Sequence, residues 1–158
     1  MADLHPTCVL INSILQAAGL PGRVRILDRP APTAVTAAEQ LGVEVGAIVN
    51  SLIFSTAERA PLLVLTSGAH RVDTARVAAL VGTATLSRAT ADFVRETTGQ
   101  PIGGVAPIGH PAPIRTLLDT ALAEFPEIWA AGGIPHAVFP ISYPDLAALT
   151  SAQPVAVA

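Results

Sequence analysis

The segment QPIGGVAPIGHPAP, residues 100–113, is the part of the sequence around which the rest is arranged. Its fourteen positions hold three glycines and four prolines, so it forms neither a regular helix nor a central strand. Glycine permits positive φ and close approach of the backbone to a ligand, while proline stiffens its surroundings. Such a segment can point several N–H groups into one concavity, which suits an anion or a developing oxyanion. Composition alone favours a simpler interpretation, a loop that connects two strands.

The composition is that of a folded domain. Of the 158 residues, 51% are hydrophobic and 13% are charged, far from the composition of disordered chains. Aromatic residues make up 4%, so the core must be built mainly from Ala, Val, Leu and Ile. We therefore expect one domain over residues 1–158, long enough to bury a sizeable core.

The charged residues exclude several kinds of chemistry. All nine basic residues are arginines, and without lysine the chain has no Schiff-base chemistry. A formal net charge of −3 argues against a protein that holds long nucleic acids by neutralising phosphates, and we expect no DNA partner. Contact with one end of an RNA remains compatible with this charge.

The N-terminal region gives no sign of export. Residues 1–6 lack a basic stretch followed by an apolar one, and no apolar run approaches the ~20 residues of a membrane span. We therefore expect a soluble cytoplasmic domain without a membrane partner. The single cysteine, Cys8, falls in a predicted helix and is expected to be a small buried residue rather than a nucleophile.

Helical and strand patterns alternate along the chain. Helices are predicted over residues 6–18, 36–42, 73–82, 90–99 and 144–149, with a helical turn over 44–48. Strands are predicted over residues 23–28, 49–55, 61–66, 85–87, 114–118, 127–131 and 136–141, and the end from about 154 is expected to fray. Several connections are too short for parallel crossovers, so we predict an α+β fold with a mixed, curved or barrel-like sheet surrounded by helices.

Polar residues at two places deserve separate interpretations. Asn50 shares a strand face with Leu52 and Phe54. If that face is buried, an unpaired amide costs about 1–3 kcal/mol, and the alternative is a partly wet residue near a loop. His70 and Arg71 follow a buried strand and form the strongest local cationic cluster. Solvated turn residues are the simpler interpretation of this pair, and ligand contacts are the alternative.

Known catalytic motifs are missing. The four histidines show no metal-ligand spacing with Cys or acidic residues, and no nucleophile elbow, phosphate loop or dinucleotide fingerprint is present. We expect neither a metal nor a cofactor. A hydrolase without a conventional nucleophile requires an already activated substrate and backbone donors that stabilise the transition state.

Six segments resemble the YbaK/ProX/EbsC family, which comprises aminoacyl-tRNA deacylases and the related editing domain of bacterial prolyl-tRNA synthetase. The resemblance extends from about Ala37 to Thr150, and its most specific element is a G-x-x-x-P loop, met here by Gly103 and Pro107. The segments are AAEQLGV (37–43), IVNSLIF (48–54), LVLTSG (63–68), RVD (71–73), TGQPIGGVAP (98–107) and WAAGG (129–133).

The resemblance implies hydrolysis of the ester that joins a mischarged amino acid to the 3′ end of tRNA, with the terminal ribose hydroxyl assisting. It implies that the loop supplies backbone N–H groups to the aminoacyl carbonyl, and that pocket size selects the substrate. The partners are the tRNA acceptor end and an aminoacyl-tRNA synthetase. Candidate catalytic residues are Gly103, Gly104, Val105, Pro107 and Asn50. Candidate substrate-binding residues are Leu52, Phe54, Ser67, Gly68, His70, Arg71 and His136, of which Leu52, Phe54 and His136 fit the core equally well.

One position departs from the family pattern. Most characterised members of the family carry a lysine where this chain has Asn50, and a neutral amide cannot offer charge to a phosphate. Two hypotheses follow. The chain is a deacylase with a lysine-free site, or it is a relative that binds tRNA ends or a small aminoacyl-like ligand without hydrolysing it.

Overall fold

The computed structural model describes residues 4–31 and 33–158. The helices there are α1 (Pro6–Ala17), α2 (Ala34–Leu41), α3 (Thr74–Val81), α4 (Ala91–Thr98) and α5 (Tyr143–Thr150), with the 3-10 turns η1 (Val45–Ala47) and η2 (Thr120–Glu124). The strands there are β1 (Arg25–Ile26), β2 (Ile48–Thr56), β3 (Pro61–Ser67), β4 (Leu86–Arg88), β5 (Arg115–Asp119), β6 (Ile128–Ala131), β7 (Ala137–Ile141) and β8 (Gln153–Val155).

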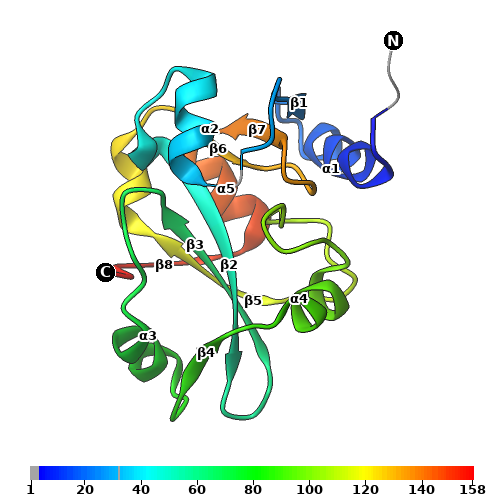
Figure 1. Cartoon of the computed structure of the whole chain (residues 1–158). Coiled ribbons are helices and arrows are strands. Elements are labelled where there is room, and N and C mark those ends of the chain that lie inside the picture. Colours follow the sequence, from blue (N-terminus) through cyan, green and yellow to red (C-terminus); the bar gives the residue numbers. More distant parts are fainter. Residues whose placement is uncertain (1–3, 32) are drawn as a thin grey trace.

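The strands form one mixed sheet with the order β1-β7-β6-β2-β3-β5-β8, and β4 pairs with β2 beside this path (Figure 1). The pairs β2–β6, β3–β5 and β5–β8 are parallel, and the remaining pairs are antiparallel. The predicted α+β class with a mixed sheet is therefore confirmed. The sheet is open, because β1 and β8 end the order without pairing with each other, so it does not close into a barrel.

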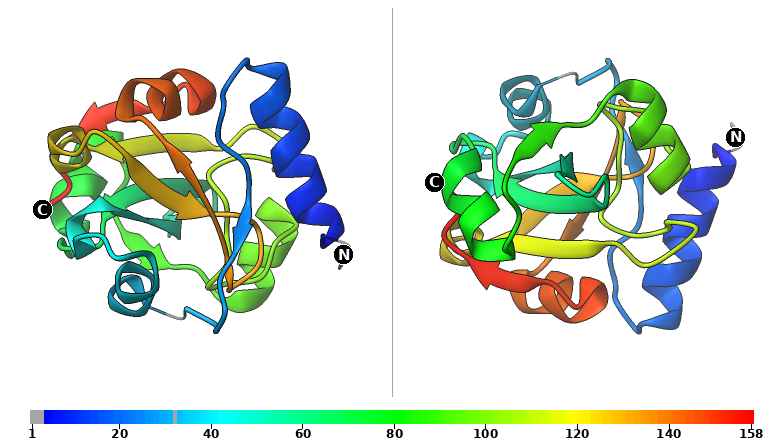
Figure 2. Two further views of the ribbon diagram at one scale, coloured as in Figure 1. Left: turned by 90° about the horizontal axis from the view of Figure 1, so that it is seen from above. Right: turned by 90° about the horizontal axis from the view of Figure 1, so that it is seen from below.

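Strand β3 is buried on both faces, as its near-continuous apolar sequence predicts. Leu63 and Leu65 belong to the larger core cluster, and Leu62 and Val64 point to a second cluster on the opposite face. Figure 2 shows the helices arranged around the sheet, with α1 and α3 on opposite sides of the molecule. The sheet therefore has core on both faces, and the helices cover them.

Capping residues set both ends of α3 and of α4, the helix that precedes the candidate loop. Asp73 and Thr90 each accept a hydrogen bond from the backbone N–H three residues later, at the starts of α3 and α4. Gly82 and Gly99 end these helices in the left-handed conformation. Both helices, counted with their caps, span the predicted ranges 73–82 and 90–99, and the Gly/Pro segment follows α4 directly.

Helix α2 begins earlier than predicted. Its cap is Thr33, not Thr36, because the hydroxyl of each threonine accepts the backbone N–H of the other at 3.2 Å. The sequence contains two overlapping capping patterns, and the first one adds residues to the start of the helix. The predicted start of this helix at residue 36 is therefore wrong.

The first predicted strand and the C-terminal end of the chain also differ from the prediction. The half-buried strand over residues 23–28 shrinks to the two exposed residues of β1. The C-terminal end, expected to fray from about 154, instead forms β8 beside β5. Val157 is fully buried, and its carbonyl accepts the Asp73 N–H at 2.8 Å. Burial of this valine in the second core cluster fixes the end of the chain.

Candidate active site

A cavity of about 480 Å³ lies beside β2, within the size range of small-molecule sites. Its walls come from β2, the start of α2, residues 102–105 and the connection between β6 and β7. Asn50, Leu52, Gly68, Gly103 and Val105 all line it. The structure thus brings five of the residues singled out from the sequence into one cavity.

The cavity opens where β2 changes its strand partner. β6 pairs with Ile48 and Val49, and β4 pairs with residues 54–56, at the other end of β2 (Figure 1). Between them, residues 50–52 face no strand of the described chain on that side. Successive residues of β2, Asn50 and Ser51 among them, line the cavity at this gap. An unpaired strand edge also presents backbone N–H and C=O groups to a ligand.

Two polar side chains in the gap lack partners. Asn50 is half-buried, and its amide makes no hydrogen bond to another described residue. The Ser51 hydroxyl is buried and is likewise without a hydrogen-bond partner in the described part of the chain. The partly exposed Asn50 amide is therefore suited to pairing with a ligand, whereas the buried Ser51 hydroxyl carries the cost of about 1–3 kcal/mol that an unsatisfied buried polar group brings.

Gly103 and Gly104 have different roles in the loop beside the cavity. Gly103 has φ +88° and lines the cavity, and a Cβ there would meet nothing within 4 Å. Gly104 lies against residues 134–135, where a Cβ would stand 2.6 Å from the Ile134 carbonyl carbon. The Gly104 N–H already donates to the Pro101 carbonyl at 3.1 Å. Gly104 therefore permits close packing, whereas its N–H is not free for a ligand.

The available backbone donors are on either side of Gly104. Gly103 and Val105 line the cavity, and their N–H groups donate to no other described residue. Val105 is 4% exposed, so its N–H lies in surroundings with little water. Donors in such surroundings stabilise negative charge on a ligand more strongly than donors in water.

Gln100 holds the loop in place. Its buried side chain accepts the Ala106 N–H at 2.7 Å and donates to the Ile108 carbonyl at 3.1 Å. Its own N–H donates to the Thr98 hydroxyl at 3.0 Å. One amide thus replaces the backbone pairing that a Gly/Pro segment cannot make, and it fixes the loop as a rigid wall of the cavity.

His110 adds a further tie to the same loop. Its Nε2 lies 2.8 Å from the Ala106 carbonyl, so Nε2–H donates. Burial is the main cause that lowers the pKa of His110 below its ordinary value of 6.5, and the hydrogen bond to Ala106 opposes this. Burial therefore favours the neutral form of the imidazole.

The remaining sequence candidates lie elsewhere. Phe54 is 1% exposed in the second core cluster and does not line the cavity, which agrees with the alternative that it belongs to the core. His136 is half-buried and does not line the cavity, although its neighbours Pro135 and Ala137 do. Pro107, the last residue of the G-x-x-x-P loop, is buried and lines a separate groove. Arg71 is exposed and also does not line the cavity.

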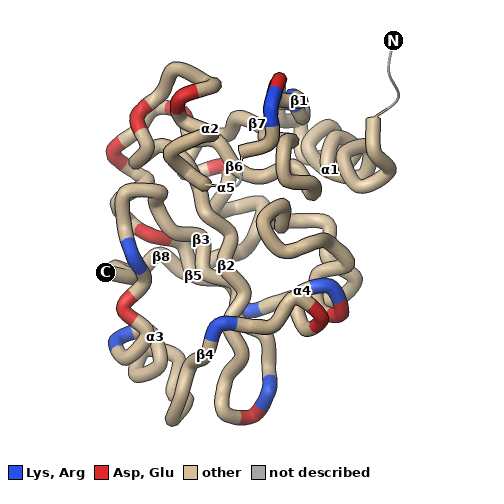
Figure 3. The backbone as a smooth tube through the Cα atoms, viewed as in Figure 1, with Lys and Arg blue, Asp and Glu red and all other residues tan. Residues whose placement is uncertain are grey.

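Charge is scarce around the cavity. Figure 3 shows the charged positions mainly in the outer loops and helices, with a largely uncharged middle. Among the lining residues, Arg88 of β4 is the one with a charged side chain. The sequence did not single out Arg88, because it lies in a short strand with no distinctive motif.

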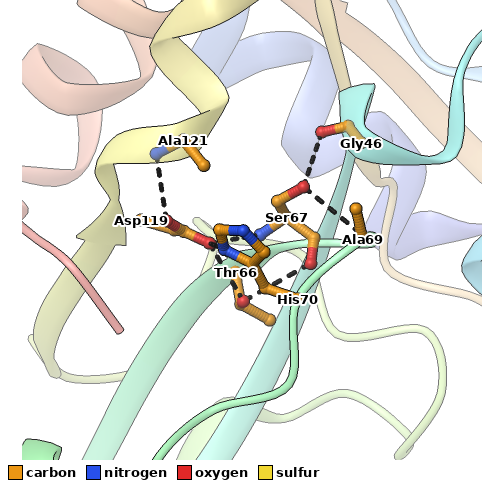
Figure 4. Close-up of polar contacts among 7 residues, drawn as sticks. All are labelled: Gly46, Thr66, Ser67, Ala69, His70, Asp119 and Ala121. Atoms are coloured by element: carbon orange, nitrogen blue, oxygen red, sulfur yellow. Dashed lines mark hydrogen bonds and ion pairs between the residues drawn. The ribbon is translucent and has the colours of Figure 1, made fainter. Parts of the chain in front are cut away.

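Ser67 and His70 belong to a separate polar cluster around Asp119 (Figure 4). One carboxylate oxygen of Asp119, Oδ2, accepts from the Thr66 hydroxyl at 3.2 Å, the Ser67 N–H at 3.0 Å and His70 Nδ1 at 2.9 Å. Oδ1 accepts the Ala121 N–H at 3.0 Å, and the Ser67 hydroxyl donates to the Gly46 carbonyl at 2.8 Å. These groups satisfy one another and join β3, β5 and η1.

Other features of the described residues complete this picture. Cys8 is fully buried, as predicted, and burial raises the pKa of its thiol. Within residues 4–31 and 33–158, no three His, Cys, Asp or Glu side chains gather as a metal-binding group. No helix in these residues combines the length and apolarity that crossing a membrane requires.

Comparison with known proteins identifies the family. Residues 28–149 match the model of the aminoacyl-tRNA editing domain. This chain belongs to that family. The editing domain is also 40% identical to a solved protein proposed to be a trans-editing enzyme for prolyl-tRNA synthetase. That match covers 98% of both chains with a TM-score of 0.91.

Two further solved structures share the architecture of the editing domain. One, from work on grafting epitope backbones onto scaffold proteins, is 37% identical with a TM-score of 0.90, and 98% of both chains is covered. The other is described as a hypothetical protein and is 30% identical with a TM-score of 0.86. That match covers 93% of the editing domain and 97% of the other chain.

Proposed function

We propose that this editing domain hydrolyses the ester bond of mischarged aminoacyl-tRNA in the cavity beside β2. The observation that carries the proposal is the meeting of two kinds of unpartnered group in one cavity. The Gly103 and Val105 N–H groups lie in the loop, and Asn50 and Ser51 lie in the gap of β2. Membership in the editing family supplies the substrate class.

In the proposed reaction the aminoacyl carbonyl oxygen accepts the loop N–H groups. Water, assisted by the terminal ribose hydroxyl, attacks the carbonyl carbon, and the bond from that carbon to the ribose oxygen breaks. The ribose oxygen takes up a proton, and the products are the free amino acid and uncharged tRNA. Backbone donors at the oxyanion typically contribute about 10²–10³ each in rate.

The roles of Asn50 and Ser51 follow from their neutral charge. Each side chain can donate to and accept from the ribose hydroxyls or the amino acid, but neither brings a positive charge. The Ser51 hydroxyl has no histidine or carboxylate partner among the described residues to act as its base. We therefore assign Asn50 to substrate positioning and Ser51, whose hydroxyl is buried, to the wall of the cavity, with Leu52 as an apolar wall and Gly68 as a close-packed border.

The proposed substrate is tRNA that prolyl-tRNA synthetase has charged with an amino acid smaller than proline. This proposal extends to the editing domain what is said of its 40%-identical relative. A synthetase pocket shaped for proline cannot strongly reject smaller apolar residues, which is the situation that a second sieve corrects. The work would take place in the cytoplasm, with the synthetase as a functional partner.

The test is a deacylation assay on purified tRNA species. We expect release of alanine, serine or cysteine from tRNA for proline, and retention of proline on the same tRNA. Activity should survive exhaustive dialysis against EDTA, because we propose that the reaction uses the groups of the chain. If the protein binds these tRNA species but releases no amino acid, the result would support the alternative that it binds tRNA ends without hydrolysing the ester.

A further inference from the structure

We propose that Arg88 binds the phosphodiester group on the 5′ side of the terminal nucleotide of tRNA. This inference rests on the proposed function, because it places the aminoacyl ester at the loop end of the cavity. It also answers a question that the absence of lysine leaves open, namely which residue contacts the negative charge of the acceptor end.

Arg88 lies where it could meet a phosphate at the cavity. Arg88 is the residue with a charged side chain among those that line the cavity, and it is exposed. The described residues contain no acidic side chain in an ion pair with it; the pair found there joins His70 to Asp119. An arginine with an unpaired guanidinium at the mouth of a ligand cavity is suited to bind a phosphate.

The side chain is also held in place. Its guanidinium carbon lies 5.8 Å from the centroid of the Phe54 ring, within the range of cation–π contacts. Phe54 is 1% exposed and pairs with Arg88 between β2 and β4. A rigid core ring therefore supports the arginine before substrate arrives, so little conformational entropy is lost when it binds.

The spacing fits one nucleotide. Asn50 and Phe54 are four residues apart on β2, which is about 13 Å along a strand. The loop packs against the β6–β7 connection at residues 134–135, on the side of the gap where β6 pairs with β2 and Asn50 begins the unpaired stretch, and Arg88 pairs with Phe54 at the other end. In an aminoacylated acceptor end, a single ribose separates the ester from the 5′ phosphate. An ester at the loop thus directs the phosphate towards β4, and the exposed side of the cavity suits a polyanion that continues into solvent.

The anion could instead be a carboxylate on the amino acid side chain, and the experiment separates the two sources. Two substrates carry the same alanyl ester, one on adenosine without a phosphate and one on the 3′ end of a full tRNA for proline. Variants Arg88→Gln, Arg88→Lys and, as a matched exposed arginine on α3, Arg76→Gln are compared with the wild type. Thermal melting confirms that each variant is folded.

We expect Arg88→Gln to lower kcat/KM on alanyl-tRNA about 10- to 100-fold, mainly through KM, and to change hydrolysis of alanyl-adenosine less than twofold. The slope of log KM against log salt should become shallower by about 0.7 to 1. Arg88→Lys should recover part of the loss, and Arg76→Gln should behave as wild type. The ratio of kcat/KM for aspartyl-tRNA to kcat/KM for alanyl-tRNA should be the same in the wild type and in Arg88→Gln.

Equal losses on both substrates would overturn the proposal and make Arg88 a structural residue. A loss confined to aspartyl-tRNA would overturn it in favour of the carboxylate. If the wild type hydrolyses neither substrate, the deacylase function itself fails. Arg88 is then tested alone by binding of a fluorescein-labelled CCA trinucleotide, where salt-dependent binding weakened by Arg88→Gln supports the phosphate contact and unchanged binding contradicts it.

Discussion

The Asp119 cluster and the gap in β2 are both rich in polar groups, and they differ in how these groups are used. Around Asp119, each carboxylate oxygen accepts hydrogen bonds from neighbouring strands and turns (Figure 4). In the gap, the Ser51 hydroxyl and the Asn50 amide have no partner among the described residues. The cluster is built to hold the sheet together, whereas the gap keeps hydrogen-bonding capacity for another molecule.

This difference separates residues that are adjacent in the sequence. Gly68 lines the cavity, but Ser67 and His70 direct their side chains into the Asp119 cluster. A histidine and a serine near an aspartate therefore do not form a catalytic set here, because the Ser67 hydroxyl donates to the Gly46 carbonyl. The two regions contain similar types of polar residue, and they differ in whether the polar groups have hydrogen-bond partners among the described residues.

The largest expected effect comes from removing the centre of the cluster. Asp119→Ala leaves the Thr66 hydroxyl and the Ser67 and Ala121 N–H groups without their acceptor, and we expect a loss of about 3–5 kcal/mol in the free energy of unfolding. Urea unfolding measures this. Ordinary surface substitutions change the free energy of unfolding by about 0.5 kcal/mol. A change of less than about 1 kcal/mol for Asp119→Ala would therefore contradict the structural role assigned to the cluster.

The second effect tests the loop. Gly104→Val places side-chain atoms against the backbone at Ile134 and Pro135, so the loop must move and carry the Val105 N–H away from the cavity. We expect the deacylation rate to fall about 10²–10³-fold, with a loss of stability of about 1–3 kcal/mol. Gly103→Ala has space for its Cβ and should lose about 1–2 kcal/mol through its positive φ. A Gly104→Val protein with normal turnover would show that the loop only connects strands.

The smallest effect concerns pH. The pKa of folded His110 lies below 6.5, mainly because of burial, so the unfolded chain binds more protons than the folded one as pH falls below about 6.5. The contribution of His110 to stability is therefore present above 6.5 and is lost as pH falls towards the folded pKa. We expect a lower melting temperature at pH 5 than at pH 7, and a smaller difference in His110→Gln. An equal difference in both proteins would contradict this assignment.

Local patterns in the sequence predicted most elements of the fold. The capping residues Asp73 and Thr90 and the apolar run of β3 specify their elements without help from distant residues. Apart from the start of α2, where two local capping patterns overlap, the errors lie where contacts between distant residues decide the structure. β8 is short and polar at its start, and it is ordered by pairing with β5 and by burial of Val157, which no local pattern reveals.

The candidate site was predictable only where it lies on a motif. The glycine-rich loop and Asn50 could be selected from the sequence, and the structure places Asn50, Gly103 and Val105 in one cavity. Ser51 was not singled out from the sequence, and its place beside the cavity follows from the change of strand partner along β2. Gln100 and Arg88 act through contacts with distant residues, so their spacing in the sequence carried no signal.

The most direct test of the account compares one residue from each region in the same assay. Single-turnover deacylation of alanyl-tRNA for proline is measured with the wild type, Asn50→Ala and His70→Ala, together with the melting temperature of each protein. We predict that Asn50→Ala slows the reaction about 2- to 12-fold, the loss of one hydrogen bond, with unchanged melting. His70→Ala should lower the melting temperature and leave the rate within twofold, a change of about 0.4 kcal/mol. A slower reaction with His70→Ala and an unchanged one with Asn50→Ala would place the chemistry at the Asp119 cluster and contradict the account.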